Sequence, residues 1–445
     1  MKKSKISGWG LYPSQICQQF SPQNKEELQY IISSLNEECI ARGNGRSYGD
    51  SALNLNNTIS TLGLNKFLSY DRKRGVLECQ SGVLLSDIFD IFLPKGWISP
   101  VTPGTKFVTI GGMIASDIHG KNHHIDGSFC NHILEMKVLN SENKIITCSE
   151  QHNSDLFFAT CGGMGLTGII ISATIQMKQV STAFIQQTVI STKNFKEAVK
   201  VFNETASSTY SVAWIDCLAK GKSLGRSVIF LGEHVPVGAD FPKNLLHTHL
   251  SKNKKFSIPF FFPSFILNKF SIMIFNALYY FINSRKPKSS IIDLETFFYP
   301  LDNILNWNKI YGRKGFIQYQ CVIPRLQSEK GITELLETIS QSGQGSFLAV
   351  LKMFGPSKRG FFSFPCEGLT LALDFKINNK TFQLCEQLDE IVCKYNGHLY
   401  LTKDARQSSN MFNKTHPGVE ELKTFRKTSN ANKIFSSLQS QRLKL

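Results

Sequence analysis

Three glycine-rich segments within the first 170 residues constrain the fold of this chain more than any other feature. They run from Arg42 to Asp50, from Pro103 to His124 and from Cys161 to Gly168. Glycines at this density let backbone N–H groups approach an anion closely, as the binding of a pyrophosphate requires. Any one segment could be a tight turn between strands, but the three together favour a large phosphorylated cofactor.

The common nucleotide-binding motifs do not account for these segments. None reads Gly-x-Gly-x-x-Gly at the start of a helix with an acidic residue about 20 positions on, so a Rossmann NAD site is disfavoured. A Gly-Lys-Ser/Thr phosphate loop is also absent from the sequence. The cofactor is therefore expected to be held by a different fold.

The length and the periodicity of the chain predict two α+β domains. A chain of 445 residues exceeds the size at which one hydrophobic core stops growing. Short β-rich runs alternate with glycine turns in the first part, where residues 25–35 have helical spacing. Further on, an aromatic strand is expected at 316–323 and a helix at 329–342. Two helical stretches, 419–426 and 435–443, follow near the C-terminus.

Charge and cysteine usage bear on partners and compartment. The net charge of +16 favours an anionic partner, whether nucleic acid, an acidic membrane face or a phosphate-bearing ligand. The 11 cysteines are scattered singly, which suggests reduced thiols in the cytoplasm. No apolar stretch typical of a signal peptide follows the basic N-terminus. The apolar run 256–282 is interrupted by Pro259, Pro263 and Lys269, so a membrane-spanning helix is not expected there.

The second glycine-rich segment also holds three histidines. His119 and His123 are spaced like ligands on one face of a helix, and His124 follows. Gly120 disfavours a regular helix, and apart from Asp117 no nearby side chain completes a coordination shell. We expect no metal here, whereas a histidine beside such a loop could orient a substrate hydroxyl.

Residues 41–50, 117–124 and 163–168 carry a specific resemblance. The chain resembles the vanillyl-alcohol-oxidase, or PCMH, type of FAD-linked oxidases, and within them the family of decaprenylphosphoryl-β-D-ribose 2-epimerase oxidase subunits. The resemblance runs essentially from end to end. It implies a two-domain α+β fold in which residues 1–182 and 398–445 form the FAD-binding domain. Residues 183–397 would form an α+β substrate domain over the flavin.

The resemblance also implies a reaction. FAD would accept a hydride from C2 of the ribose in a polyprenylphosphoryl-β-D-ribose, giving a 2-keto sugar. A separate NADH-dependent reductase would then complete epimerisation to the arabinose form used in cell-envelope polysaccharides, at the inner membrane. Two other readings stay open: an FAD oxidase of a free alditol or sugar lactone, and a basic nucleic-acid-binding protein suggested by charge alone.

Site residues follow from the resemblance position by position. The catalytic residues would be His119, Lys403 and Tyr48. Substrate would be bound by Lys121, Trp214, Tyr299, Gln318, Gln320 and Lys403. FAD would be bound by Arg42, Gly43, Asn44, Gly45, Arg46, Ser47, Tyr48, Pro103, Gly104, Thr105, Thr109, Gly111, Gly112, Ala115, Asp117, Gly120, Asn122, His123, Gly163, Gly165, Gly168, Ile169 and Tyr400.

Three departures from the family pattern modify these expectations. Arg46 stands where many relatives have a histidine bonded to the flavin, so non-covalent FAD is expected. Ala372 and Thr370 stand where many relatives have a pocket cysteine and an asparagine, which leaves the exact sugar open.

A basic, aromatic insert lies between Lys252 and Lys288. It contains seven basic residues and no acidic one around a phenylalanine-rich centre. Such a segment is typical of a surface that meets anionic lipid, and the alternative is a buried helical hairpin with a basic rim.

Overall fold

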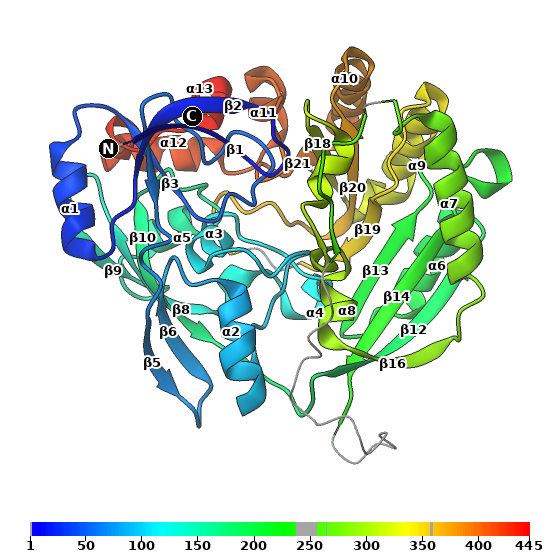
Figure 1. Ribbon diagram of the computed structural model, residues 1–445, viewed down its shortest axis with the longest axis horizontal. Coiled ribbons are helices and arrows are strands. Elements are labelled where there is room, and N and C mark those ends of the chain that lie inside the picture. The colour runs from blue at the N-terminus through cyan, green and yellow to red at the C-terminus, as the bar shows by residue number, and fades with distance from the viewer. Residues whose placement is uncertain (1, 237–255, 264, 357–358) are drawn as a thin grey trace.

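The computed structural model describes residues 2–236, 256–263, 265–356 and 359–445. Lys252, Lys254 and Lys255 of the basic insert lie outside this part of the chain. The described residues form two lobes, each with a β-sheet core and covering helices (Figure 1). The expected α+β class is confirmed.

The N-terminal lobe holds two sheets. One has the strand order β1 (Lys2–Ser7), β2 (Ser14–Phe20), β4 (Asn57–Ser60) and β3 (Cys39–Arg42). The other has the order β5 (Phe67–Asp71), β6 (Val76–Gln80), β10 (Ile169–Gln176), β8 (Ile133–Leu139) and β9 (Ile145–Cys148). A short pair, β7 (Trp97–Ile98) and β11 (Lys178–Gln179), lies apart. The helices of this lobe are α1 (Lys25–Ser34), α2 (Leu85–Phe92), α3 (Ile110–Ala115), α4 (His123–Asp126) and α5 (Ser154–Thr160).

The second lobe is built on an eight-stranded sheet. Its order is β16 (Ser289–Asp293), β12 (Phe184–Thr192), β14 (Ser227–His234), β13 (Tyr210–Ile215), β19 (Ala349–Phe354), β20 (Gly368–Lys376), β18 (Phe316–Pro324) and β21 (His398–Leu399). Short strands β15 (Phe256–Ser257) and β17 (Ile304–Leu305) pair separately. The helices are α6 (Phe195–Glu204), α7 (Lys269–Asn283), α8 (Leu294–Phe298), α9 (Arg325–Ser342) and α10 (Asn379–Lys394).

The two faces of the eight-stranded sheet have different neighbours. Side chains of α6, α9 and α10 pack with Ala213 and Ile215 of β13 in one core cluster. Trp214, which alternates with them, points to the opposite face and packs against Tyr279 of α7. This second face carries the polar side chains described below, which line one cavity together with residues of the N-terminal lobe.

The C-terminal segment returns to the N-terminal lobe. Helices α11 (Ser409–Thr415), α12 (Val419–Thr428) and α13 (Leu438–Leu443) lie beside the first sheet (Figure 1). Phe435 makes an isolated bridge with Cys39 of β3 and shares a core cluster with α1. Leu443 packs in another cluster with Ile40 and Met164. The last helices therefore complete the core that carries the first and third glycine-rich segments.

Among the described residues, no helix is long and apolar enough to cross a membrane.

Candidate functional site

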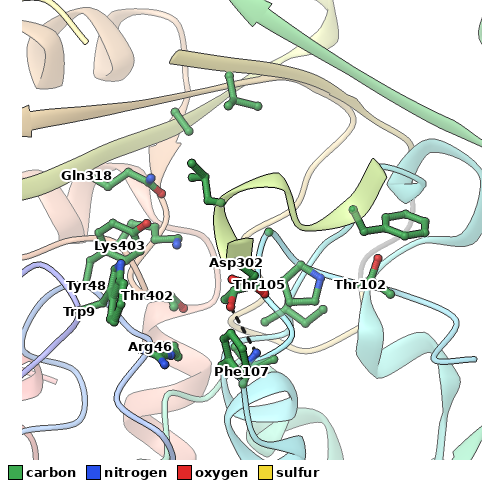
Figure 2. A pocket seen from close by; sticks show the side chains of 18 of the residues that line it. Trp9, Arg46, Tyr48, Thr102, Thr105, Phe107, Asp302, Gln318, Thr402 and Lys403 are labelled. Carbon is green, nitrogen blue, oxygen red and sulfur yellow. Dashed lines mark hydrogen bonds between the residues drawn. The ribbon is translucent and has the colours of Figure 1, made fainter. Parts of the chain in front are cut away.

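The three glycine-rich segments and the inner face of the eight-stranded sheet line one cavity of about 1310 Å³. The cavity wall begins at residues 43–48, continues along 102–112 and 164–168, and crosses to β18, β19 and β20. Figure 2 shows side chains of both lobes pointing into it. A cavity of this extent is large enough for a cofactor and a substrate together.

Glycine is required where the loops approach each other. A Cβ atom on Gly43 would lie 2.2 Å from the hydroxyl of Thr109, which caps α3. Gly45 adopts a φ of +61°, and a Cβ there would lie 2.3 Å from the guanidinium of Arg42. A side chain at position 43 would push this loop away from Thr109, and one at position 45 would displace Arg42 and strain the backbone. The close approach leaves backbone groups on the cavity wall, as a pyrophosphate cradle needs.

Arg46 supplies an unused donor in the same wall. Its guanidinium carbon lies 4.2 Å from the centre of the Trp9 ring. Its Nε atom is buried and has no hydrogen-bond partner among the described residues. A buried cationic donor without an acceptor suits an anionic or carbonyl oxygen of a bound group. The cradle and this donor fit a dinucleotide cofactor such as FAD.

The opposite wall is a polar patch made by the pleat of the sheet. Antiparallel register pairs Gln318 with Asp374 and Gln320 with Ala372, so these side chains share one face. The Gln318 amide donates to the Asp374 carboxyl. Lys352 of the neighbouring strand pairs in register with Thr370 and also lines the cavity. Hydrogen-bonding groups for a polar ligand are thus arrayed opposite the glycine loops.

His119 is held on both ring nitrogens. Its Nε2 lies 3.0 Å from the side-chain nitrogen of Gln320, and its Nδ1 lies 3.2 Å from Nζ of Lys352. Burial, and then the charge of Lys352, lower the pKa of His119 well below its usual value. The imidazole is therefore neutral at physiological pH, with one ring nitrogen as a donor and the other as an acceptor.

Lys403 lies where the two walls meet. Its Nζ is 3.8 Å from the centre of the Tyr48 ring, and Figure 2 shows the two side chains together. Burial lowers the pKa of Lys403 to about 8, while the nearby Asp374 opposes that shift. Burial raises the pKa of Asp374 to about 7, against its contact with Gln318 and the charge of Lys403. The site thus holds an amine and a carboxyl that both titrate near neutral pH.

Two further lysines, Lys121 and Lys352, line the cavity, and within the described part of the chain neither forms an ion pair with a carboxylate. Burial lowers the pKa values of Lys121 and Lys352 to about 7. Lys121 donates to the backbone oxygen of Phe297, and its Nζ lies 4.3 Å from the centre of that ring. An anion in the cavity would favour the charged forms of these lysines.

Most of the side chains expected at the site line this cavity. They are His119, Lys403, Tyr48, Lys121, Trp214, Gln318, Gln320, Gly43, Asn44, Gly45, Arg46, Ser47, Pro103, Gly104, Thr105, Thr109, Gly111, Gly112, Ala115, Gly120, Gly165, Gly168 and Tyr400. Seven others do not line it, and these are Arg42, Asp117, Asn122, His123, Gly163, Ile169 and Tyr299.

Those seven residues support the wall or the core instead. Arg42 donates to the backbone oxygen of Ser7, and Asn122 donates to that of Pro100. Asp117 accepts from the backbone of Cys130. His123 accepts from the backbone of Gly355. Tyr299 packs in the core with its ring edge to face against Phe89, so its side chain does not reach the cavity.

Three charged side chains that line the cavity were not predicted from the sequence. Lys352 and Asp374 face the cavity because of strand register, and Asp302 reaches it from the 3-10 helix Pro300–Asn303 after α8. Alternation along residues 349–354 and 368–376 predicts which side chains share a face of each strand. It does not predict which face points into the cavity, because that depends on the register of the strands in the sheet. In the described part of the chain, no three His, Cys, Asp or Glu side chains gather as a metal site would require.

Comparisons with known proteins agree with this geometry. A family model described as an FAD binding domain matches residues 19–149. The decaprenylphosphoryl-beta-D-ribose oxidase of Mycolicibacterium smegmatis is 35% identical over 99% of this chain and 97% of its own length. An uncharacterized protein of Streptomyces coelicolor is 26% identical over 82% of this chain and 100% of its own. The L-gulonolactone oxidase of Mus musculus is 25% identical over 38% of each chain.

Because the first similarity spans nearly the whole of both chains, it extends beyond the cofactor loops to the sheet that faces them. This chain is therefore an FAD-dependent oxidoreductase that belongs to the family of FAD-linked oxidases including decaprenylphosphoryl-beta-D-ribose oxidase.

Proposed function

We propose that this protein oxidises the ribose 2-hydroxyl of a polyprenylphosphoryl-β-D-ribose to the 2-keto sugar. The observation that carries the proposal is the single cavity in which the glycine cradle faces His119, Lys403 and the two glutamines of β18. The name of the Mycolicibacterium smegmatis relative supplies the sugar class. The product would pass to an NADH-dependent reductase, which would complete epimerisation to the arabinose form.

Each residue has a defined task in this reaction. FAD, when bound, supplies the acceptor for the hydride that leaves C2. The ammonium of Lys403 stabilises negative charge that develops on the reacting oxygen in a site shielded from water. Neutral His119 takes the hydroxyl proton once one ring nitrogen exchanges its contact with Gln320 or Lys352 for the substrate hydroxyl. Gln318 and Gln320 orient the remaining hydroxyls, since an amide both donates and accepts.

We also propose that residues 1–182 and 398–445 act as the FAD-binding unit and residues 183–397 as the substrate unit. The packing of α12 and α13 on the N-terminal core supports this division. Strand β21 extends the eight-stranded sheet to Leu399, so the boundary lies close to the point where the chain leaves that sheet.

For the lipid part of the substrate, we propose a peripheral association with anionic lipid at the cytoplasmic face of the inner membrane. The support is the apolar outer surface of α7, next to the side of the cavity that Phe275, Tyr279 and Lys286 line. A chain leaving the cavity there would emerge beside this surface.

The position of oxidation is tested by trapping the product. Purified protein is incubated with a polyprenylphosphoryl ribose, the mixture is reduced with sodium borodeuteride, and the released pentose is analysed by mass spectrometry. Deuterium at C2 in a mixture of ribose and arabinose is the expected result. Deuterium at another carbon, or none above a sample without protein, would show that this hydroxyl is not the one oxidised.

Two lysine variants assign the chemistry to the site. Lys403→Met should reduce product formation by on the order of 10²-fold or more, because a stabilising charge is lost at the reacting oxygen. Lys427→Met, at an exposed position of α12, should leave the rate unchanged. Equal rates for the two variants would contradict the role of Lys403.

A free alditol or sugar lactone is the second candidate substrate. The similarity to L-gulonolactone oxidase favours it, although that similarity covers only 38% of this chain. Such a substrate has no apolar chain, so the exposed apolar face of α7 would have no role in binding it.

A further inference from the structure

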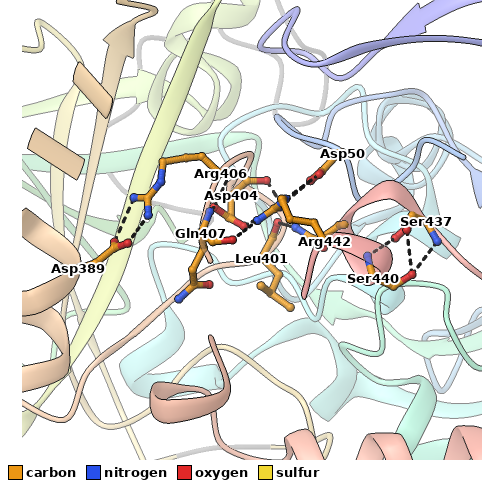
Figure 3. Close-up of polar contacts among 10 residues, drawn as sticks. Asp50, Asp389, Leu401, Asp404, Arg406, Gln407, Ser437, Ser440 and Arg442 are labelled. Atoms are coloured by element: carbon orange, nitrogen blue, oxygen red, sulfur yellow. Dashed lines mark hydrogen bonds and ion pairs between the residues drawn. The ribbon is translucent and has the colours of Figure 1, made fainter. Parts of the chain in front are cut away.

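Arg442 of the last helix contacts both Asp50 and Asp404, and Asp404 follows Lys403 in the chain (Figure 3). Arg442 of α13 donates from Nε to Oδ2 of Asp50 and from Nη2 to Oδ1 of the same carboxylate, each at 2.9 Å. Its Nη2 also donates to Oδ2 of Asp404 at 2.9 Å, and Nη1 donates to the backbone oxygen of Gln407. One guanidinium therefore joins three separate points of the chain.

Two of these points lie next to residues of the proposed site. Asp404 follows Lys403 directly, and Asp50 lies two residues after Tyr48. The Tyr48 backbone N–H donates to the backbone oxygen of Thr402 at 2.9 Å, so the two segments already touch. By holding both carboxylates, Arg442 sets the position of the turn relative to the loop.

Asp404 transmits this restraint into the turn itself. Its Oδ1 accepts from the backbone N–H groups of Arg406 at 3.0 Å and Gln407 at 2.8 Å. A carboxylate that caps two successive N–H groups fixes the local backbone. A displacement of Asp404 would therefore displace Lys403, whose Nζ must stay over the Tyr48 ring.

Both carboxylates are buried, so their negative charges depend on the guanidinium of Arg442 for stabilisation. Asp50 is 4% and Asp404 is 5% exposed. Burial raises the pKa of Asp404, but Arg442 and Arg406 outweigh it and hold the pKa below its usual value. Without Arg442, the two buried carboxylates would lose a positively charged partner that they share. Their mutual repulsion would then move them apart.

We propose that Arg442 is a positioning residue, which holds Lys403 and Tyr48 in register from outside the cavity. The side chain does not line the cavity and acts only through Asp50 and Asp404. This proposal rests on the function proposed for Lys403, and its test needs no sugar substrate.

The test measures how tightly sulfite adds to the bound flavin, because a nearby ammonium stabilises the anionic adduct. In Arg442→Gln we expect the sulfite dissociation constant to rise on the order of tenfold, as Lys403 moves away. The alkaline limb of sulfite binding, set by the Lys403 pKa of about 8, should also move to higher pH. The shift is upward because a less buried amine recovers part of its ordinary pKa.

Arg359→Gln is the matched control. Arg359 makes a similar two-pronged pair with Glu150, and its side chain is 21% exposed against 24% for Arg442. Its contacts among the described residues are with Glu150, Phe157 and Phe158, away from the turn of Lys403 and the loop of Tyr48. Because Glu150 is 47% exposed, the loss of this pair should change thermal stability little, and the variant should keep the sulfite affinity and its pH dependence.

Two milder variants keep the proposal open to refutation if Arg442→Gln fails to retain FAD. Arg442→Lys keeps the positive charge, but an ammonium cannot span both carboxylates as a planar guanidinium does. Asp50→Asn removes the negative charge of one of the two carboxylates. Each should weaken sulfite binding by less than Arg442→Gln would. Unchanged affinity and an unchanged pH limb in the variants that retain FAD would overturn the proposal, whatever their thermal stability.

Discussion

Arg46 decides how the cofactor can be held. It stands in the loop 43–47, with its guanidinium over the Trp9 ring and 5.6 Å from the centre of the Phe107 ring. Burial lowers the pKa of Arg46 from its usual value, yet a guanidinium stays protonated throughout the physiological range. A protonated guanidinium is not a nucleophile, so we expect this position to offer hydrogen bonds and charge to the flavin and to form no covalent bond with it.

Acid precipitation tests this directly. We expect trichloroacetic acid to release the yellow cofactor into the supernatant, where its absorbance and mass identify intact FAD. Denaturation with heat at neutral pH should give the same partition. A yellow pellet that survives washing would contradict the non-covalent attachment and point to another residue as the anchor.

Single residues show what the sequence could and could not predict about the site. Of the glycines expected at the cofactor in segments 43–45 and 163–168, Gly43, Gly45, Gly165 and Gly168 line the cavity and Gly163 does not. His119 and Lys403 followed from motif resemblance, and both line the cavity. Lys352 and Asp374 could not be found this way. Their inward orientation depends on the register of β18, β19 and β20, which is set by pairings distant in sequence.

Helix α7 is the element whose surface is hardest to explain in a protein surrounded by water. Phe270, Ile274 and Phe281 recur on its outer face and are 74%, 69% and 53% exposed. The opposite face is anchored, since Asn276 donates to Asp216 at 2.8 Å. The expected basic, aromatic insert thus contains one helix with an apolar outer face, and the described residues 256–263 and 265–288 show no buried helical hairpin.

This face predicts binding to lipid. The triple variant Phe270→Ser, Ile274→Ser and Phe281→Ser should bind vesicles of phosphatidylglycerol on the order of 10²-fold more weakly, because several exposed apolar side chains lose their burial in the interface. Sedimentation with vesicles measures the effect. FAD content should stay the same, since none of the three side chains lines the cavity.

A matched control variant tests whether the effect on vesicle binding is specific to α7 or follows from the loss of any exposed apolar side chain. Tyr30→Ser with Leu326→Ser removes apolar side chains that are 75% and 99% exposed on other elements. Their removal should not affect vesicle binding. Equal binding by both variants and the unaltered protein would exclude α7 as the lipid-facing surface.

At the scale of the whole molecule, the C-terminal segment packs back against the N-terminal lobe. The C-terminal segment contributes Ala431 and Phe435 to the core beneath α1, and Arg442 to the network beside the cavity. Periodicity predicted helices near 419–426 and 435–443, and the structure has them at Val419–Thr428 and Leu438–Leu443. Their placement could not be predicted from pattern, because it depends on contacts with strands nearly 400 residues earlier.

The measurement that tests the account most directly is bleaching of the bound flavin in the absence of oxygen. Purified protein is mixed in turn with a polyprenylphosphoryl ribose, free ribose, an alditol and a sugar lactone, and the flavin absorbance is followed. We expect rapid bleaching by the lipid-linked ribose alone. Bleaching by a free polyol or lactone, with none by the lipid-linked ribose, would contradict it and assign the protein to the other class of oxidase.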